Sequence, residues 1–164
     1  LARTGSKVVA LDLDLGGANL HTALGLEQPR QTLGDFVNGR NSLQECVAAT
    51  GIQNLQMISG AQDSTTAPNL TQEQKVRLVQ DLRGLEADYL VLDLGAGTAL
   101  NTIDFFILAD VGIVTVLPEP TSIENAYRFI RTAYYRRLMV TPKLAPIRPM
   151  LEAAQDAKNT LGLR

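Results

Sequence analysis

The sequence has 164 residues, of which 45% are hydrophobic and 20% are charged, and its formal net charge at pH 7 is −2. This length supports one hydrophobic core, so we expect a single domain over residues 1–164. The small net charge excludes a general attraction to nucleic acid or to anionic membranes, and the aspartates at 93, 104 and 110 interrupt the most apolar region, which excludes a membrane span.

Short apolar runs alternate with helix signals along the chain. The residues before Gly5 resemble the end of a helix. Four runs then predict strands, at residues 7–13, 55–59, 89–94 and 111–117. Nearly continuous apolar runs of this length are typical of parallel strands that are buried on both faces. The alternation with helices predicts a doubly wound α/β domain, with a mostly parallel sheet and helices on both faces.

Helix starts are indicated by a hydroxyl residue three positions before a carboxylate or an amide, the spacing of a capping box. The pairs are Ser42 with Glu45, Thr71 with Gln74, and Thr121 with Glu124. We expect the first helix to end at Gly51 and to contain Cys46, the single cysteine, as a small buried residue. The second helix is expected to bury Val76, Val79 and Leu82, and the longest loop is expected at 61–70.

Three carboxylates follow predicted strands. Asp12 and Asp14 come at the end of the first strand, and Asp93 comes at the end of the third. Ligands of such sheets bind outside the carboxyl ends of the strands. Clustered carboxylates repel one another unless a cation lies among them, and Mg²⁺ prefers oxygen ligands. The pattern predicts a Mg²⁺ site, although each acid alone is equally typical of a helix cap at a strand end.

Glycines follow the same strands, at positions 16 and 17 and at positions 95 and 97. They allow the backbone to approach a ligand closely, but glycine after a strand is also ordinary turn chemistry. Neither GxGxxG nor GxxxxGK[ST] occurs in these residues. Their absence counts against a nucleotide enzyme if this is the whole chain.

The segment ALDLDLGGANLHTALGL resembles the switch I region, here residues 12–25, of the MinD/ParA family of deviant P-loop ATPases. The family pattern, roughly D-x-D-x-G-x-x-N-L-x-x-x-L-G, is matched by Asp12, Asp14, Gly16, Asn19, Leu20, Leu24 and Gly25. The stretch DYLVLDLGAG resembles switch II, here 93–98, through Asp93 and Gly97. Residues 109–130 resemble the next strand and helix of the FlhG-like branch, which governs flagellar number and placement. The resemblance covers residues 1 to about 138.

This resemblance implies a P-loop NTPase fold and a slow, Mg²⁺-dependent ATPase that dimerises in its ATP state. Asp14 would orient or deprotonate the attacking water, and Asp12 and Asp93 would hold or support the metal. The residues implied to contact the nucleotide are Asn19, Gly97, Pro118 and Glu119. The family role is spatial regulation of cell division or of flagella, together with a partner protein. The implied location is the cytoplasm, including the inner membrane surface or a cell pole.

The family's phosphate loop, KGGVGK[ST], belongs one helix upstream of residue 7 and does not occur in the sequence. The resemblance therefore implies that the loop is encoded upstream of Leu1. The stretch after residue 136 contains no clear strand either. We expect the fold to be incomplete at the N-terminus and near the C-terminus.

A basic helix is predicted over residues 121–138. Its arginines are Arg128, Arg131, Arg136 and Arg137, and they alternate with tyrosines and Phe129. Such a pattern is typical of a solvated helix face with an aromatic stripe toward the core. The alternative is a docking surface for an acidic partner, DNA or anionic lipid.

Two other functional classes stay open. A non-catalytic adaptor or regulatory domain on the same fold would lack the phosphate loop. A phosphorelay receiver also gathers acids at strand ends, but its acids lie closer in sequence, and a lysine ends one of its later strands. Here Pro118 follows the last predicted strand, which disfavours the receiver.

Overall fold

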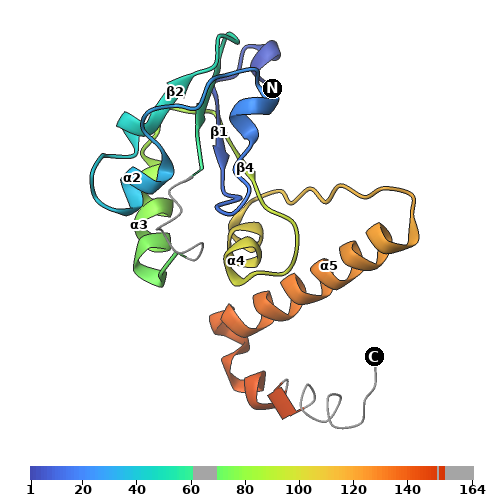
Figure 1. Ribbon diagram of the computed structural model, residues 1–164. Coiled ribbons are helices and arrows are strands. Elements are labelled where there is room, and N and C mark those ends of the chain that lie inside the picture. Colours follow the sequence, from blue (N-terminus) through green and yellow to red (C-terminus); the bar gives the residue numbers. More distant parts are fainter. Residues whose placement is uncertain (61–69, 151, 154–164) are drawn as a thin grey trace. The chain divides into compact units, whose positions relative to one another are not determined.

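The computed structural model describes residues 1–60, 70–150 and 152–153. The chain forms two compact units, Leu1–Ala96 and Gly97–Arg164. The first unit contains the β-sheet, and the second contains the helices α4 and α5 (Figure 1). Of the predicted loop at 61–70, all but Leu70 lies outside the described residues.

Within residues 1–60 and 70–96, the sheet of the first unit has four strands in the order β2-β3-β1-β4. The strands are β1 (Val8–Asp12), β2 (Val47–Ala49), β3 (Leu55–Ile58) and β4 (Tyr89–Asp93). Strand β1 is parallel to both β3 and β4, whereas β2 is antiparallel to β3. The three predicted parallel strands are therefore confirmed. In the register of β1 and β4, Asp12 lies opposite Asp93, so two of the predicted site residues are neighbours at one end of the sheet.

The two neighbouring strands β1 and β4 differ in burial. Every residue of β1 is buried, and Leu11 is 0% exposed. In β4, by contrast, Tyr89, Leu90 and Val91 are 48%, 38% and 42% exposed. Among the described residues, β4 is the last strand of the sheet, although apolar residues on both of its faces are typical of a parallel strand that is covered on both faces.

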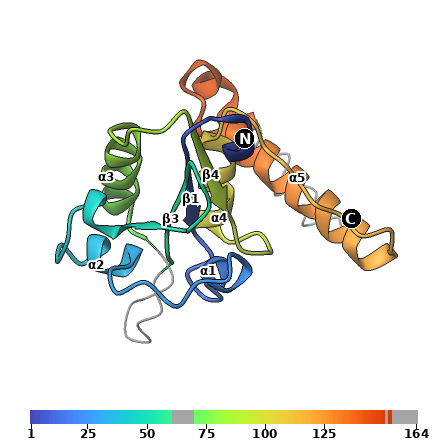
Figure 2. The same cartoon turned by 90° about the horizontal axis from the view of Figure 1, so that it is seen from above.

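The helices of the first unit include α1 (Leu20–Ala23), α2 (Leu33–Val37) and α3 (Gln72–Arg83). Figure 1 and Figure 2 show α2 and α3 on the same side of the sheet, and Arg77 Cζ of α3 lies 4.4 Å from the centroid of the Phe36 ring in α2. The short 3-10 turn at Ala2–Thr4 ends at Gly5, whose φ of +96° favours glycine. A short 3-10 turn thus precedes β1, and the interpretation of these residues as the end of a longer helix stays a prediction.

The capping box of α3 is confirmed. The Gln74 N–H donates to Thr71 Oγ1 at 3.2 Å, and the Thr71 N–H donates to Gln74 Oε1 at 2.8 Å. Leu82 is buried as predicted, but Val76 is 48% exposed and Val79 is only half-buried, whereas Lys75 and Leu78 are buried. The buried face contains Leu78 and Leu82, which are four residues apart, and a leucine in place of a valine removes more apolar area from water.

The helix predicted from Ser42 to Gly51 is wrong. The capping box forms, since the Ser42 N–H donates to Glu45 Oε2 at 2.7 Å, but it starts only a 3-10 turn at Gln44–Cys46. The chain then enters β2 and pairs with β3. A capping box satisfies only the first turn of a helix, and here pairing with a neighbouring strand replaces its continuation.

Cys46 is buried as predicted, with 1% of its surface exposed. Its Sγ donates to the Thr32 carbonyl at 3.2 Å. Burial raises the pKa of the thiol, and the negative charge of Asp35 raises it further. Because the thiolate is the reactive form, we expect Cys46 to react with a disulfide reagent such as DTNB only on unfolding. Rapid labelling of the native protein at pH 8 would contradict this assignment.

The second unit consists mainly of α4 (Leu100–Leu108), α5 (Pro120–Val140) and a 3-10 segment at Pro142–Ile147. Phe106 and Phe129 join α4 to α5 by an edge-to-face contact with ring centroids 4.8 Å apart. Helix α5 confirms the predicted basic helix, but its N-cap is Glu119 rather than Thr121. Pro120 occupies the first helical position, where its fixed φ and missing N–H suit a helix start, so Thr121 lies inside the helix.

The strand predicted at 111–117 does not form. Its apolar residues are exposed, with Val111 at 76% and Ile113 at 81%. A strand requires a neighbour with which to exchange hydrogen bonds, and the described part of the chain supplies none to this segment. Among the described residues, no helix combines the length and the hydropathy needed to cross a membrane.

Candidate functional site

Asp12 is the last residue of β1 and is 1% exposed. Both of its carboxylate oxygens accept backbone hydrogen bonds. The Asp14 N–H donates to Oδ1 at 3.1 Å, and the N–H of Leu20, the first residue of α1, donates to Oδ2 at 3.0 Å. Asp12 thus holds both ends of the loop between β1 and α1 by hydrogen bonds. An acid at the end of a strand can have this capping role.

The carboxylate of Asp14 lies between two glycines. The Gly17 N–H donates to Asp14 Oδ1 at 3.1 Å. On the other side, Gly95 approaches so closely that a Cβ at this position would lie 2.7 Å from the same oxygen. Gly17 belongs to the loop after β1, whereas Gly95 follows β4. The side chain of Asp14 therefore brings the two loops into contact.

Asp93 ends β4 with its side chain exposed to solvent. Its backbone carbonyl accepts a hydrogen bond from the Leu13 N–H at 2.8 Å. Partial desolvation raises the pKa of the Asp93 carboxyl, and the negative charges of Asp12 and Asp14 raise it further. The structure therefore brings together the three carboxylates that the sequence predicted at one end of the sheet. Their repulsion contributes to the raised pKa of Asp93.

A close approach at the end of β3 adds Gly60 to this region. A Cβ on Gly60 would lie 2.7 Å from the Cβ of Ala18 and 3.1 Å from the carbonyl oxygen of Asp12. The sequence interpretation missed both this contact and the contact of Gly95 with Asp14. The available signal was a glycine within two residues of the end of each neighbouring strand.

The donor set determines which kind of cation could be held here. Within the described residues, no three His, Cys, Asp or Glu side chains converge to hold a metal ion. The oxygens of Asp12 are engaged by backbone amides, whereas Asp93 points its charge toward solvent. This arrangement fits a hydrated ion held through water by Asp93, and Mg²⁺ commonly retains several of its waters.

The other predicted site residues are distributed over both units. Asn19 is the N-cap of α1 and is exposed. Gly97, which has a φ of +96°, begins the second unit. Pro118 and Glu119 immediately precede α5 in that unit. The roles assigned to these residues, and to the three aspartates, stay predictions.

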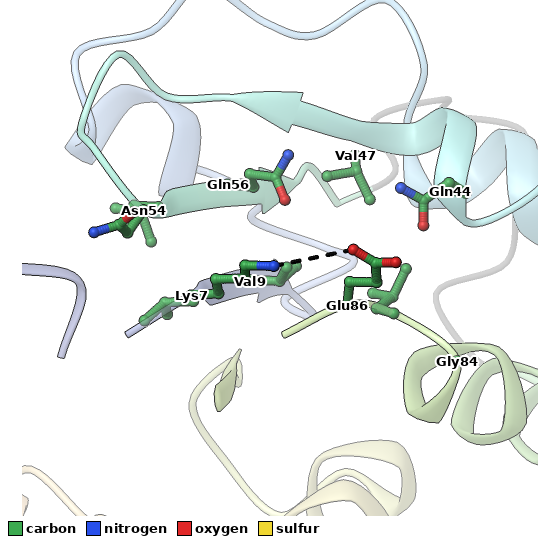
Figure 3. Close-up of a pocket in the computed structure, with 11 residues that line it drawn as sticks. Lys7, Val9, Gln44, Val47, Asn54, Gln56, Gly84 and Glu86 are labelled. Carbon is green, nitrogen blue, oxygen red and sulfur yellow. Dashed lines mark ion pairs between the residues drawn. The ribbon is translucent and has the colours of Figure 1, made fainter. Parts of the chain in front are cut away.

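A separate pocket of about 570 Å³ lies at the amino ends of β1 and β3 (Figure 3). Figure 3 shows Lys7 and Glu86 facing each other across it, and Lys7 Nζ lies 4.0 Å from Glu86 Oε2. None of the three aspartates lines this pocket. Because ligands of parallel α/β sheets bind at the carboxyl ends of the strands, we place the candidate site at the aspartates.

No protein-family model matches the chain, but individual proteins do. The antiactivator FleN of Pseudomonas aeruginosa is 34% identical over 133 residues, which are 80% of this chain and 47% of FleN. The septum site-determining protein MinD of Escherichia coli K12 is 30% identical over 134 residues, which are 79% of this chain and 48% of MinD. The chain spans about half the length of these curated relatives.

Solved structures give the same relationship. A chain of the MinC:MinD cell division protein complex of Aquifex aeolicus matches with a TM-score of 0.66 and 25% identity, over 79% of this chain and 52% of that chain. MinD of Pyrococcus horikoshii complexed with Mg-ADP matches with a TM-score of 0.63 and 23% identity, over 79% and 53%, and shares the fold. With the parallel-dominant sheet, the similarity to FleN and MinD and the fold shared with MinD support placing the chain in the MinD/ParA family of deviant P-loop ATPases.

Proposed function

We propose that the intact protein containing this sequence is a Mg²⁺-dependent ATPase that regulates cell division or flagellar placement in space. The observation that carries the proposal is the meeting of Asp12, Asp14 and Asp93 at the carboxyl ends of β1 and β4. Their mutual repulsion favours a cation at this site. The Mg-ADP complex of one MinD structure supports the choice of cofactors.

Each aspartate has a separate task in this proposal. Asp93 holds the hydrated ion through its exposed carboxylate, and Mg²⁺, when bound, neutralises the charge that develops on the transferred phosphoryl group. Asp14 orients or deprotonates the attacking water from its fixed position between Gly17 and Gly95. Asp12 keeps the loop after β1 in place through its two backbone hydrogen bonds.

No strand of the described residues pairs with the outer side of β4, which supports the proposal that a further strand carrying the phosphate loop pairs there. The Tyr89 N–H donates to the Lys7 carbonyl, and the Asp93 carbonyl accepts from the Leu13 N–H. Because backbone groups alternate in direction along a strand, those of Leu90 and Leu92 point away from β1. A parallel strand paired there would place the loop at its carboxyl end beside Asp93, and lysines in that loop would balance the acids.

Two measurements test this function. The residues encoded upstream of Leu1 should contain a glycine-rich loop with two lysines, and an upstream segment without Gly-Lys-Ser/Thr would contradict the ATPase. The intact protein should release phosphate from ATP with Mg²⁺ and not with excess EDTA. Intact protein without turnover in either condition would support the non-catalytic adaptor instead.

Dimerisation in the ATP state and a partner protein are further parts of the proposal. The MinC:MinD complex shows MinD assembled with another protein, and FleN is described as an antiactivator. A cytoplasmic protein that acts at the inner membrane surface or at a cell pole is consistent with such roles. We propose the same general arrangement for this protein.

In the structure, acidic side chains pair with two of the four arginines of the predicted basic surface of α5. Arg136 Nε donates to Asp104 Oδ1 at 2.8 Å, and Arg128 forms an ion pair with Glu124. Arg131 and Arg137 are exposed. At 100° per residue, these two arginines lie on opposite sides of a narrow stripe of exposed apolar residues. The stripe consists of Ile123, Tyr127, Ile130 and Tyr134.

An apolar stripe with arginines along both sides suits an anionic lipid surface better than DNA. We therefore expect the intact protein to sediment with phosphatidylglycerol vesicles. The charge reversals Arg131→Glu and Arg137→Glu together should weaken this binding about tenfold or more at low salt, because each basic residue near such a surface contributes about 1 kcal/mol. The control is Arg128→Glu, which lies off the stripe. Equal binding of all three proteins, or binding to DNA alone, would contradict the lipid surface.

A further inference from the structure

We propose that Gly95 and Gly17 are positioning residues for Asp14, and that the loop after β4 controls the position of the Asp14 carboxylate through Gly95. This inference rests on the water-activating role proposed for Asp14. It concerns how the carboxylate is held and what can release it.

The space beside Gly95 is limited by the side chain of Asp14. A Cβ at this position would lie 2.7 Å from Asp14 Oδ1, 2.8 Å from Cγ and 3.3 Å from Oδ2. These are its three nearest atoms, and the first two are closer than real Cβ atoms approach any neighbour. Gly95 does not have a left-handed φ, so its backbone conformation does not require glycine. The effect of an added Cβ at position 95 would therefore fall on the Asp14 carboxylate, which would have to move.

Gly17 also contacts this carboxylate, and we call the position of the carboxylate against Gly95 and Gly17 the seat of Asp14. Its N–H donates to Asp14 Oδ1 at 3.1 Å, and a Cβ on Gly17 would lie 3.0 Å from Asp14 Oδ2. Gly17 also has no left-handed φ. Gly16 provides the contrast in the same loop, since a Cβ there would meet nothing within 4 Å. Close approach is thus confined to the two glycines that face the carboxylate.

The seat connects two parts of the proposed site. Asp14 is tied to β1 because its N–H donates to Asp12 Oδ1, whereas Gly95 lies two residues beyond Asp93 at the end of β4. A displacement of the loop after β4 therefore removes the contact of Gly95 with the Asp14 carboxylate, whereas the hydrogen bond from the Gly17 N–H remains. In this way the loop after Asp93, the acid proposed to hold the metal ion, sets the orientation of Asp14, the acid proposed to activate the water.

The first test is the substitution Gly95→Ala in the intact protein. The added Cβ should displace the carboxylate, so kcat for ATP should fall about 10- to 100-fold, within the range that a misplaced general base can cost. KM for ATP should stay within about twofold. The matched control is Ala96→Ser, which adds one atom at an exposed position of the same loop. A Gly95→Ala protein with wild-type kcat would overturn the proposal.

The second test uses thermal stability and does not depend on ATPase activity. Gly95→Ala should lower Tm in the wild-type background but not in the Asp14→Ala background, where the atoms it would meet are absent. The effect of alanine on the unfolded chain is the same in both backgrounds and cancels. Equal changes in Tm in both backgrounds would show that the seat does not exist. If Gly95→Ala lowers Tm only in the wild-type background and the intact protein does not hydrolyse ATP, the proposed ATPase is refuted but the contact between Gly95 and Asp14 is supported.

Discussion

The substitution Asp14→Asn in the intact protein is expected to lower ATP turnover about 10²- to 10⁴-fold while ATP binding changes little. The side chains of asparagine and aspartate have the same shape, so the amide fits between Gly17 and Gly95 and its oxygen can still accept the Gly17 N–H. The amide cannot accept a proton from water at neutral pH. The binding of ATP depends instead on the phosphate loop and on the metal.

Turnover is measured by phosphate release, and binding by fluorescence titration with a nucleotide analogue. The control is Glu27→Gln, which removes one negative charge from an exposed position and should leave both quantities unchanged. If Asp14→Asn retains wild-type turnover, Asp14 has no role in the chemistry. If it loses binding and turnover together, Asp14 contributes to the nucleotide site and not specifically to hydrolysis.

The substitution Asp93→Asn is expected to change metal affinity and stability in opposite directions. The amide keeps the shape but removes the charge that holds the hydrated ion, so Mg²⁺-dependent ATP affinity should fall about 10- to 100-fold. Without Mg²⁺, Tm should rise, because the substitution removes the charge repelled by Asp12 and Asp14. Titration calorimetry and thermal melts measure the two effects.

The stability effect has a defined pH dependence. Because the pKa of Asp93 is higher in the folded protein than its ordinary value of 3.8, the folded state binds more protons between the two values. The stability of the wild-type protein therefore falls as pH rises through this range. The advantage of Asp93→Asn should be absent below the ordinary pKa and complete above the folded pKa. An unchanged Mg²⁺ titration, or an equal advantage at every pH, would contradict the role of Asp93.

The parallel strands could be predicted from sequence because burial on two faces leaves a nearly continuous apolar run. The prediction of strands held for β1, β3 and β4, although only β1 is buried along its whole length and most of β4 is exposed. The same pattern at 111–117 failed, since an apolar run predicts a strand only where a neighbouring strand is present. The helix expected from Ser42 failed for a related reason. The capping box is a local feature, whereas the pairing of β2 with β3 depends on a distant segment.

The candidate site was predictable to the extent that it depends on strand ends. Parallel strands bring their carboxyl ends to one edge, so Asp12, Asp14 and Asp93 had to be neighbours once the strands were assigned. Their separate environments were not predictable. The two backbone hydrogen bonds of Asp12, and the ion pair that removes Arg136 from the basic surface, depend on loop paths and helix packing that no local pattern encodes.

Nucleotide binding by the intact protein is the most direct test of the central claim that these aspartates belong to a Mg²⁺-dependent ATPase. Titration calorimetry with ATP should be done in the presence of Mg²⁺ and again with excess EDTA. The proposed function predicts saturable, one-to-one binding of ATP with Mg²⁺ and markedly weaker binding with EDTA. The absence of ATP binding in both conditions, in a protein that remains folded, would contradict the ATPase and favour an adaptor built on the same fold.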